Sequence, residues 1–332
     1  MKEEVSTEVA PLFTSSANIE KAVDKEVAKV AILMCTYNGA SFLAEQVNSF
    51  ERQTHRNWQL YVSDDGSQDK TLDFLQALRK EWQSGQLQIL KGPQKGFSAN
   101  FLFLTCHADI SADFYAWSDQ DDIWKEEKLQ KALAWLYTVP SHIPAVYCGR
   151  TKLISKFGVP CGYSPKFGFP PHFSNALVQN IGGGNTMVFN QAARSLLQQA
   201  GDDVVVPSHD WWVYQLVSGV GGSVYYDPEP TILYRQHDSN LVGSNASFSA
   251  RFRRVYVLLK GGFCAWNGQN IQALETLEHR LTSESRYILA CFKAARKQRL
   301  LQRFFLVRQA GLHRQTLFGN FGLIVAILLN KI

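Results

Sequence analysis

The run Val30-Ala31-Ile32-Leu33-Met34-Cys35 decides the fold of this 332-residue chain. Six consecutive apolar residues are typical of a parallel strand that is buried on both faces of a sheet. The turn Thr36-Tyr37-Asn38-Gly39 follows, and a helix with apolar residues on one face is expected from Ser41 to about Gln53. The chain therefore enters its globular part as a strand–helix unit of an α/β protein.

The same alternation continues downstream of this unit. Strands are expected at 58–63, 87–90 and 114–117, with helices at 69–78 and 99–107 between them. This order predicts a doubly wound, mostly parallel sheet. From Ala145 onward the pattern is less regular, with short strands expected at 146–148, 152–154, 186–189, 224–226 and 231–234 and an irregular loop at 157–173.

Charge divides the chain unevenly. Residues 245–332 contain fourteen Lys and Arg against three Asp and Glu, whereas residues 1–244 contain twenty against twenty-six. We divide the chain into a polar, disordered tail (1–28), an α/β domain (29–244) and a basic helical region (245–332). The six cysteines lack zinc spacing and the N-terminus lacks an apolar signal core, so we expect reduced thiols and a cytoplasmic protein.

Polar residues gather where three of the predicted strands end. These are Thr36-Tyr37-Asn38, Asp64-Asp65-Gly66-Ser67 and the three carboxylates of Asp119-Gln120-Asp121-Asp122. The carboxyl ends of parallel strands share one edge of a sheet, where ligands bind. Carboxylates suit Mg²⁺ or Mn²⁺, and no Gly-rich phosphate loop is present, so a divalent ion is expected to hold phosphate. The alternative is a solvated acidic loop in which Asp122 caps a helix that starts near Lys125.

Taken in order, these motifs resemble family 2 glycosyltransferases, which are inverting, nucleotide-sugar-dependent enzymes of the GT-A fold. The resemblance spans roughly Val30 to Gly243, and His209-Asp210-Trp211-Trp212 is its fourth motif. A closer resemblance, to bacterial rhamnosyltransferases of surface polysaccharide, rests on four segments: Ser118–Trp124, Gly183-Gly184-Asn185-Thr186, His209–Trp212 and Tyr234-Arg235-Gln236-His237.

The resemblance assigns the donor site. It implies that Thr36, Tyr37 and Asn38 bind the base and ribose, and that Asp65 accepts a hydrogen bond from the imide of uracil or thymine. Lys95, in a Gly-flanked loop, would meet a phosphate. Each residue also has a purely structural alternative: turn formation at Asn38, an Asx-turn at Asp65 and an exposed lysine without a specific role.

The resemblance also assigns the chemistry. Asp121 would ligate Mn²⁺ or Mg²⁺, with Asp119 beside it on the metal or the ribose. Asp210 would be the general base that deprotonates the acceptor hydroxyl. The alternative makes Ser208-His209-Asp210 a helix cap and its two tryptophans part of the core.

Two further motifs are implied near the reacting sugar. Gly183 and Gly184 would let the backbone approach the acceptor, or form only a turn. His237 would reach a phosphate or the metal, or make a structural hydrogen bond. The Q-x-x-R-W signature of processive relatives is absent, which favours transfer of a single sugar, with dTDP-L-rhamnose as the donor that the resemblance implies.

The basic helical region suggests where the reaction occurs. Its cations are interleaved with Leu and Phe, and the apolar run Phe321–Leu329 is too short to span a bilayer. We expect a peripheral protein at the inner face of the plasma membrane, acting on a carbohydrate or polyprenyl-linked glycan. The alternatives are a basic bundle packed on the catalytic domain and a dimer interface. No motif indicates a nucleic-acid partner.

Two other functions compete with sugar transfer. A sugar-phosphate nucleotidyltransferase would use a similar sheet and metal, but it needs a basic, Gly-rich loop after the first strand, and Thr36–Ser41 has no basic residue. A non-catalytic scaffold for polysaccharide assembly would not need Asp119, Asp121 and Asp210.

Overall fold

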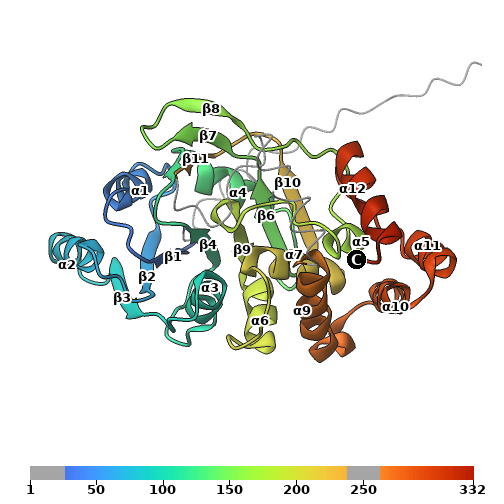
Figure 1. Cartoon of the computed structure of the whole chain (residues 1–332). Coiled ribbons are helices and arrows are strands. Elements are labelled where there is room, and N and C mark those ends of the chain that lie inside the picture. The colour runs from blue at the N-terminus through green and yellow to red at the C-terminus, as the bar shows by residue number, and fades with distance from the viewer. Residues whose placement is uncertain (1–26, 238–261) are drawn as a thin grey trace, which may run out of the picture.

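A seven-stranded, mostly parallel sheet forms the centre of the molecule (Figure 1). The computed structural model describes residues 27–237 and 262–332. The strand order is β10-β6-β9-β4-β1-β2-β3, and only β9 runs antiparallel to its neighbours. The strands are β1 (Val30–Thr36), β2 (Trp58–Asp64), β3 (Leu87–Lys91), β4 (Phe114–Ser118), β6 (Ala145–Gly149), β9 (Val188–Asn190) and β10 (Ser223–Asp227). The predicted fold class is confirmed.

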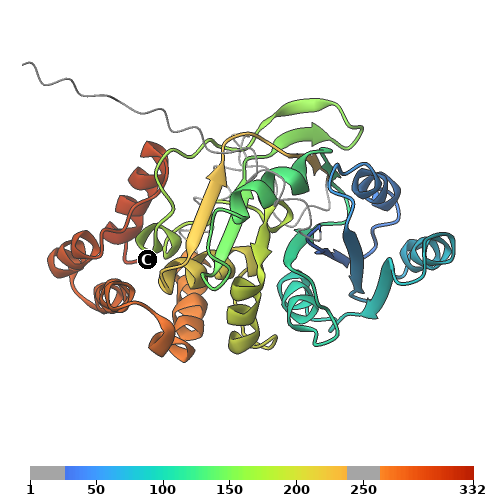
Figure 2. The same ribbon diagram turned by 180° about the vertical axis from the view of Figure 1, so that it is seen from behind.

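Both faces of this sheet are covered by helices. Alternate residues of β1 enter two separate cores, Ala31 and Leu33 on one side and Val30 and Ile32 on the other. The first core is closed by α3 (Phe97–Cys106), α6 (Gln191–Ala200) and α7 (His209–Gly219), and the second by α1 (Leu43–Glu51), α2 (Thr71–Glu81) and α4 (Lys128–Leu136). Figure 2 shows α4 on the face opposite to α3 and α6. The unbroken apolar run therefore places β1 inside the protein.

A second, four-stranded sheet begins directly beyond the carboxyl end of β4. Its order is β5-β11-β7-β8, with β5 (Ile123–Trp124), β7 (Lys152–Ser155), β8 (Pro160–Tyr163) and β11 (Ile232–Gln236). Strand β8 lies in the segment that we expected to be an irregular loop, where its pairing with β7 supplies order that the Gly- and Pro-rich sequence does not indicate. The short helix α5 (Phe173–Ala176) and the 3₁₀ turn η3 (Gly184–Thr186) lie between β8 and β9 in the chain.

Four helices follow residue 261 and pack beside β10. They are α9 (Gly262–Thr276), α10 (Ser283–Lys297), α11 (Leu300–Gln309) and α12 (Leu317–Leu328), with a 3₁₀ turn, η4 (Glu278–Arg280), after α9. Leu274, Phe292 and Leu323 from these helices join the core beneath the sheet. The expected helical character is thus present, while the expected tail and the boundary near residue 244 lie largely or wholly outside the described residues. Over the described ranges, no helix is long and apolar enough to cross a bilayer.

Candidate active site

Three carboxylates meet just beyond β4. One ligand oxygen each from Asp119, Asp121 and Asp122 can be chosen so that all lie within 4.8 Å of one another. Burial raises the pKa of Asp119 to about 8, and the negative charges of Asp121 and Asp210 add to the effect. A divalent cation would relieve this repulsion, and oxygen ligands suit Mg²⁺ or Mn²⁺. The donor set therefore fits such an ion.

The three acids are not equivalent. Asp122 is fully buried, and its two carboxylate oxygens accept hydrogen bonds from Asn185 Nδ2 at 2.5 Å and from the Arg235 backbone N–H at 3.1 Å. Asp122 therefore does not cap a helix, and α4 starts only at Lys128. Within the described residues, the Asp119 carboxylate accepts no hydrogen bond. Asp119 and Asp121 remain the better candidates for direct ligands, with Asp122 holding the loop in place.

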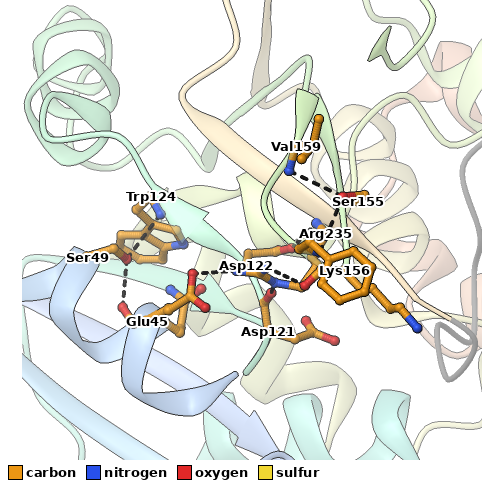
Figure 3. Close-up of polar contacts among 11 residues, drawn as sticks. Glu45, Ser49, Asp121, Asp122, Trp124, Ser155, Lys156, Val159 and Arg235 are labelled. Atoms are coloured by element: carbon orange, nitrogen blue, oxygen red, sulfur yellow. Dashed lines mark hydrogen bonds and ion pairs between the residues drawn. The ribbon is translucent and has the colours of Figure 1, made fainter. Parts of the chain in front are cut away.

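Arg235 fixes the loop from behind (Figure 3). Its side chain is 1% exposed, and its guanidinium donates to Asp121 O at 3.0 Å, Lys156 O at 3.1 Å and Glu45 Oε2 at 2.8 Å. These bonds join β11 to the acidic loop, to the β7–β8 hairpin and to α1. A planar guanidinium can reach separated acceptors through three different nitrogens at once, whereas the donors of a lysine all lie on a single nitrogen.

His237 reaches the same cluster from the end of β11. Its Nε2 lies 2.7 Å from Asp121 Oδ2, and its ring stacks on Phe42 with the centroids 4.9 Å apart. The expected proximity of His237 to the acidic cluster is present. The imidazole can orient the Asp121 carboxylate or take part in holding a cation.

The turn after β1 is tied to the acidic loop by Gln120. Its side-chain amide accepts from Tyr37 N at 2.9 Å and donates to Tyr37 O at 3.0 Å. A Cβ on Gly39 would lie 2.0 Å from Gln120 Oε1, so only glycine leaves room for this clamp. The clamp leaves the Tyr37 side chain 58% exposed, in a position to stack on a planar ring.

The neighbouring turn residues are more internal. Thr36 is buried, and its hydroxyl donates to Asp64 Oδ2 at 2.8 Å. Asn38 has a φ of 50°, and its side-chain oxygen accepts from the Gln68 backbone N–H at 2.8 Å. Both side chains thus make contacts within the fold, their predicted role in donor binding stays a prediction, and the same turn presents Tyr37 outward.

Asp65 and Lys95 meet at the next strand end. The Asp65 carboxylate accepts from Gln94 N at 2.6 Å and Gly96 N at 3.1 Å, the two residues that flank Lys95. The loop that carries the exposed Lys95 is thus held by Asp65. The structure brings these two sequence candidates together, with part of the hydrogen-bonding capacity of Asp65 already used.

Asp210 lies in the first turn of α7. Its Oδ2 accepts from Gly184 N at 3.0 Å, and its Oδ1 accepts from Trp211 N at 2.7 Å and from the Ser208 hydroxyl. Ser208 is the cap of the helix, so capping and an oriented carboxylate coexist here. Gly184, whose N–H holds Asp210, directly precedes Asn185, whose side-chain amide binds Asp122, so Asp210 lies close to the acidic cluster.

His209 supports this corner by packing. Its ring stacks on Phe101 with the centroids 4.0 Å apart, and within the described residues its nitrogens have no hydrogen-bond partner. Burial lowers the pKa of His209 to about 4, so the ring is neutral near pH 7. A Cβ on Gly184 would lie 2.3 Å from His209 Nε2, which explains the need for glycine there, whereas Gly183 is exposed beside it.

Four residues that matter for this geometry were not among the predicted site residues. Gln120 lies within the Asp119–Asp122 motif and Asn185 within the Gly183–Thr186 motif, so the sequence could have indicated both. Arg235 lies in the Tyr234–His237 motif, but its role depends on a partner in α1. Glu45, that partner, has no signal in its own sequence context.

A mostly parallel sheet whose carboxyl edge gathers an acidic cluster, an exposed tyrosine turn and an opposing carboxylate defines a nucleotide-sugar-dependent glycosyltransferase of the GT-A fold. The chain belongs to glycosyl transferase family 2, whose model matches residues 31–200. This assignment replaces the nucleotidyltransferase alternative.

A curated relative agrees with the family, and two solved structures agree with the fold. The chain is 30% identical over 244 residues to dTDP-rhamnosyl transferase RfbG of Shigella flexneri, covering 67% of this chain and 78% of that protein. Among solved structures, S. aureus TarS 1-349 in complex with UDP-GlcNAc matches with a TM-score of 0.50 and 17% identity, over 85% of this chain and 90% of that one. GalNAc-T7 with UDP, GalNAc and Mn²⁺ matches with a TM-score of 0.50 and 10% identity, over 87% and 56%. The two structural likenesses show the fold alone.

Proposed function

We propose that this protein is an inverting, metal-assisted transferase that moves one L-rhamnose from dTDP-L-rhamnose to a surface-polysaccharide or polyprenyl-linked acceptor. The donor is supported by the similarity to dTDP-rhamnosyl transferase RfbG. The observation that carries the mechanism is that two consecutive residues bind the two groups: the Gly184 N–H donates to Asp210, and the Asn185 amide donates to Asp122 of the acidic cluster. A polyprenyl-linked acceptor would place the reaction at the inner face of the plasma membrane.

The donor would lie along the edge formed by the ends of β1, β2 and β4. Tyr37 is free to stack on the base, Asp65 and the Lys95 loop lie at the next strand end, and Asp119 and Asp121 face the diphosphate. A divalent cation held by these two aspartates would neutralise charge that builds up on the leaving nucleoside diphosphate. His237 and Arg235 keep Asp121 in one orientation through its carboxylate and its backbone carbonyl.

Asp210 would take the proton from the acceptor hydroxyl. An inverting transfer needs the hydroxyl to attack from the face opposite the leaving group, with a base at that face. The Gly184 N–H and the Trp211 N–H hold the Asp210 carboxylate in one orientation, which fixes the direction from which it can take the proton. Asp119 and Asp210 thus act on the two sides of one sugar.

The test is nucleotide release from a panel of nucleotide sugars in the presence of acceptor and Mn²⁺ or Mg²⁺. We expect dTDP-L-rhamnose to be turned over best. Asp210→Asn keeps the shape of the side chain but removes the base, so kcat should fall by about 10²–10⁴-fold with little change in donor KM. Asp203→Asn, an exposed carboxylate in the loop before α7, is the matched control and should retain full activity.

Two results would count against the proposal. Undiminished kcat in Asp210→Asn would remove Asp210 as the base. Preferential turnover of another donor, such as UDP-GlcNAc, would exclude L-rhamnose as the transferred sugar but would leave the glycosyltransferase assignment in place.

A further inference from the structure

Helices α11 and α12 expose an apolar outer face. On α11, Leu301, Phe304 and Phe305 recur at helical spacing and are 86%, 50% and 60% exposed. On α12, Leu317 is 90% exposed, and three residues on its outer side are also well exposed: Phe318, Phe321 and Leu328. Large apolar side chains gathered in this way mark an interaction surface rather than ordinary scattered exposure. We call these side chains the α11–α12 outer face.

The opposite sides of the same helices are already packed. Val307 of α11 and Leu323 of α12 are buried in the main core. Arg303 is 6% exposed, and its guanidinium donates to Ile327 O at 2.7 Å and to Gln298 O at 2.7 Å, which joins α11 to the ends of α12 and α10. The outer face is therefore a fixed feature of folded helices. Figures 1 and 2 place helices α11 and α12 at the end of the molecule away from β3.

The charged side chains of the segment that carries this face are all positive. Residues 285–332 contain nine Lys and Arg and no Asp or Glu. Lys297, Arg299 and Arg308 are exposed at the ends of α10 and α11, and Arg308 follows Phe304 by one helical turn on the same side. Cations beside exposed Phe and Leu complement anionic headgroups above an acyl region. A second copy of the same face would instead bring like charges together, which disfavours self-association.

We propose that the α11–α12 outer face docks this protein on an anionic membrane surface. Phe and Leu side chains enter the headgroup region, and the flanking Lys and Arg contact lipid phosphates. The proposal deepens the proposed function, because a polyprenyl-linked acceptor resides in such a surface. Membrane binding requires neither donor nor acceptor, so it can be tested separately from transfer.

The experiment is flotation of the full-length protein with vesicles of phosphatidylglycerol and phosphatidylcholine, or of phosphatidylcholine alone. We expect at least ten-fold stronger binding to the anionic vesicles, weakening as salt is raised. The variant Phe304→Ser/Phe305→Ser/Phe318→Ser/Phe321→Ser should lose at least ten-fold in binding. Arg308→Gln should weaken binding roughly five-fold, since each cation near the surface contributes about that factor.

Matched controls separate the surface from general damage. Val205→Ser and Arg79→Gln alter an exposed apolar side chain and an exposed cation elsewhere, and they should bind vesicles like the unaltered protein. The altered side chains of α11 and α12 are exposed, so the melting temperature should stay the same. Asp210→Asn should float normally, which distinguishes failure of docking from failure of the proposed chemistry.

Equal binding to neutral and anionic vesicles, or unchanged flotation of the four-Phe variant, would overturn the proposal. A dimer in analytical ultracentrifugation that this variant dissociates would also overturn it and assign the face to a second copy of the chain.

Discussion

Replacing Arg235 with lysine should loosen the acidic loop without touching any group that meets the donor. The guanidinium binds Asp121 O, Lys156 O and Glu45 Oε2 from a position that is almost completely buried. Lysine has a single nitrogen on a flexible stem and can replace only one of these bonds well. The backbone N–H of residue 235 would still donate to Asp122, so that anchor is retained.

The size of the effect follows from the individual contacts. A hydrogen bond between a charged donor and a partly buried carbonyl contributes about 1.5–3 kcal/mol, which applies to Asp121 O. Glu45 is about half exposed, so its ion pair adds less than about 1 kcal/mol. The guanidinium also lies 4.9 Å from the Phe42 ring, worth about 0.5–2 kcal/mol. We expect Arg235→Lys to lower the free energy of unfolding by about 2–4 kcal/mol.

Two measurements check this expectation. Urea unfolding gives the loss of stability, and titration of Mn²⁺ in the transfer assay gives the cation requirement. The Mn²⁺ concentration that gives half-maximal activity should rise about ten-fold or more, because residues that position metal ligands typically change metal affinity or activity by about 10–100-fold. Glu45→Gln is the matched control, since it keeps the shape of the partner and should cost less than about 1 kcal/mol. Unchanged stability and an unchanged cation requirement in Arg235→Lys would refute the reasoning.

Three further predictions concern the same site. Burial lowers the pKa of His209 to about 4, so as pH falls below about 6.5 the unfolded chain binds a proton at this position that the native protein does not. Between pH 7 and pH 5 the free energy of unfolding of the unaltered protein should therefore fall by about 2 kcal/mol more than that of His209→Leu, as measured by urea unfolding. An equal fall in both proteins would contradict the assignment. Gly39→Ala should raise donor KM by displacing Gln120. In a double-mutant cycle, Gly39→Ala combined with Gln120→Ala should raise the free energy that corresponds to donor KM by less than the sum of the two single variants. EDTA should abolish transfer, Mn²⁺ or Mg²⁺ should restore it, and Asp121→Ala should not respond; activity that survives EDTA would exclude the metal role.

Local sequence patterns were sufficient to predict the fold class and part of the candidate site. The run at Val30–Cys35 predicts a strand buried on both faces, and its alternate residues do enter two cores. The acidic motif predicts the convergence of Asp119 and Asp121, because it follows a strand directly. Such features depend on neighbours within a few residues, which a single sequence displays.

Other features depend on contacts between distant segments. Strand β8 is ordered by pairing with β7, although its own residues favour a loop. Asp122 is directed inward by Asn185 and by the Arg235 backbone, so its carboxylate is not the helix cap that local spacing allows. Asp65 has both of its oxygens engaged by the Lys95 loop, a contact that no local pattern indicates. In each case the contact comes from a partner that is distant in the sequence, which is why the local pattern does not indicate it.

The reversed strand β9 explains how the chain brings Asp210 close to the acidic cluster. It lies between β4 and β6 and runs antiparallel to both, so the segment that precedes it enters the sheet at the edge where β4 ends. That segment contains Gly184, whose N–H holds Asp210, and Asn185, whose amide holds Asp122. The Asp210 carboxylate and the acidic cluster are thus positioned by two consecutive residues. A shift of this turn by one residue would disturb both together, so in the proposed reaction this turn would set the distance between the base and the cation.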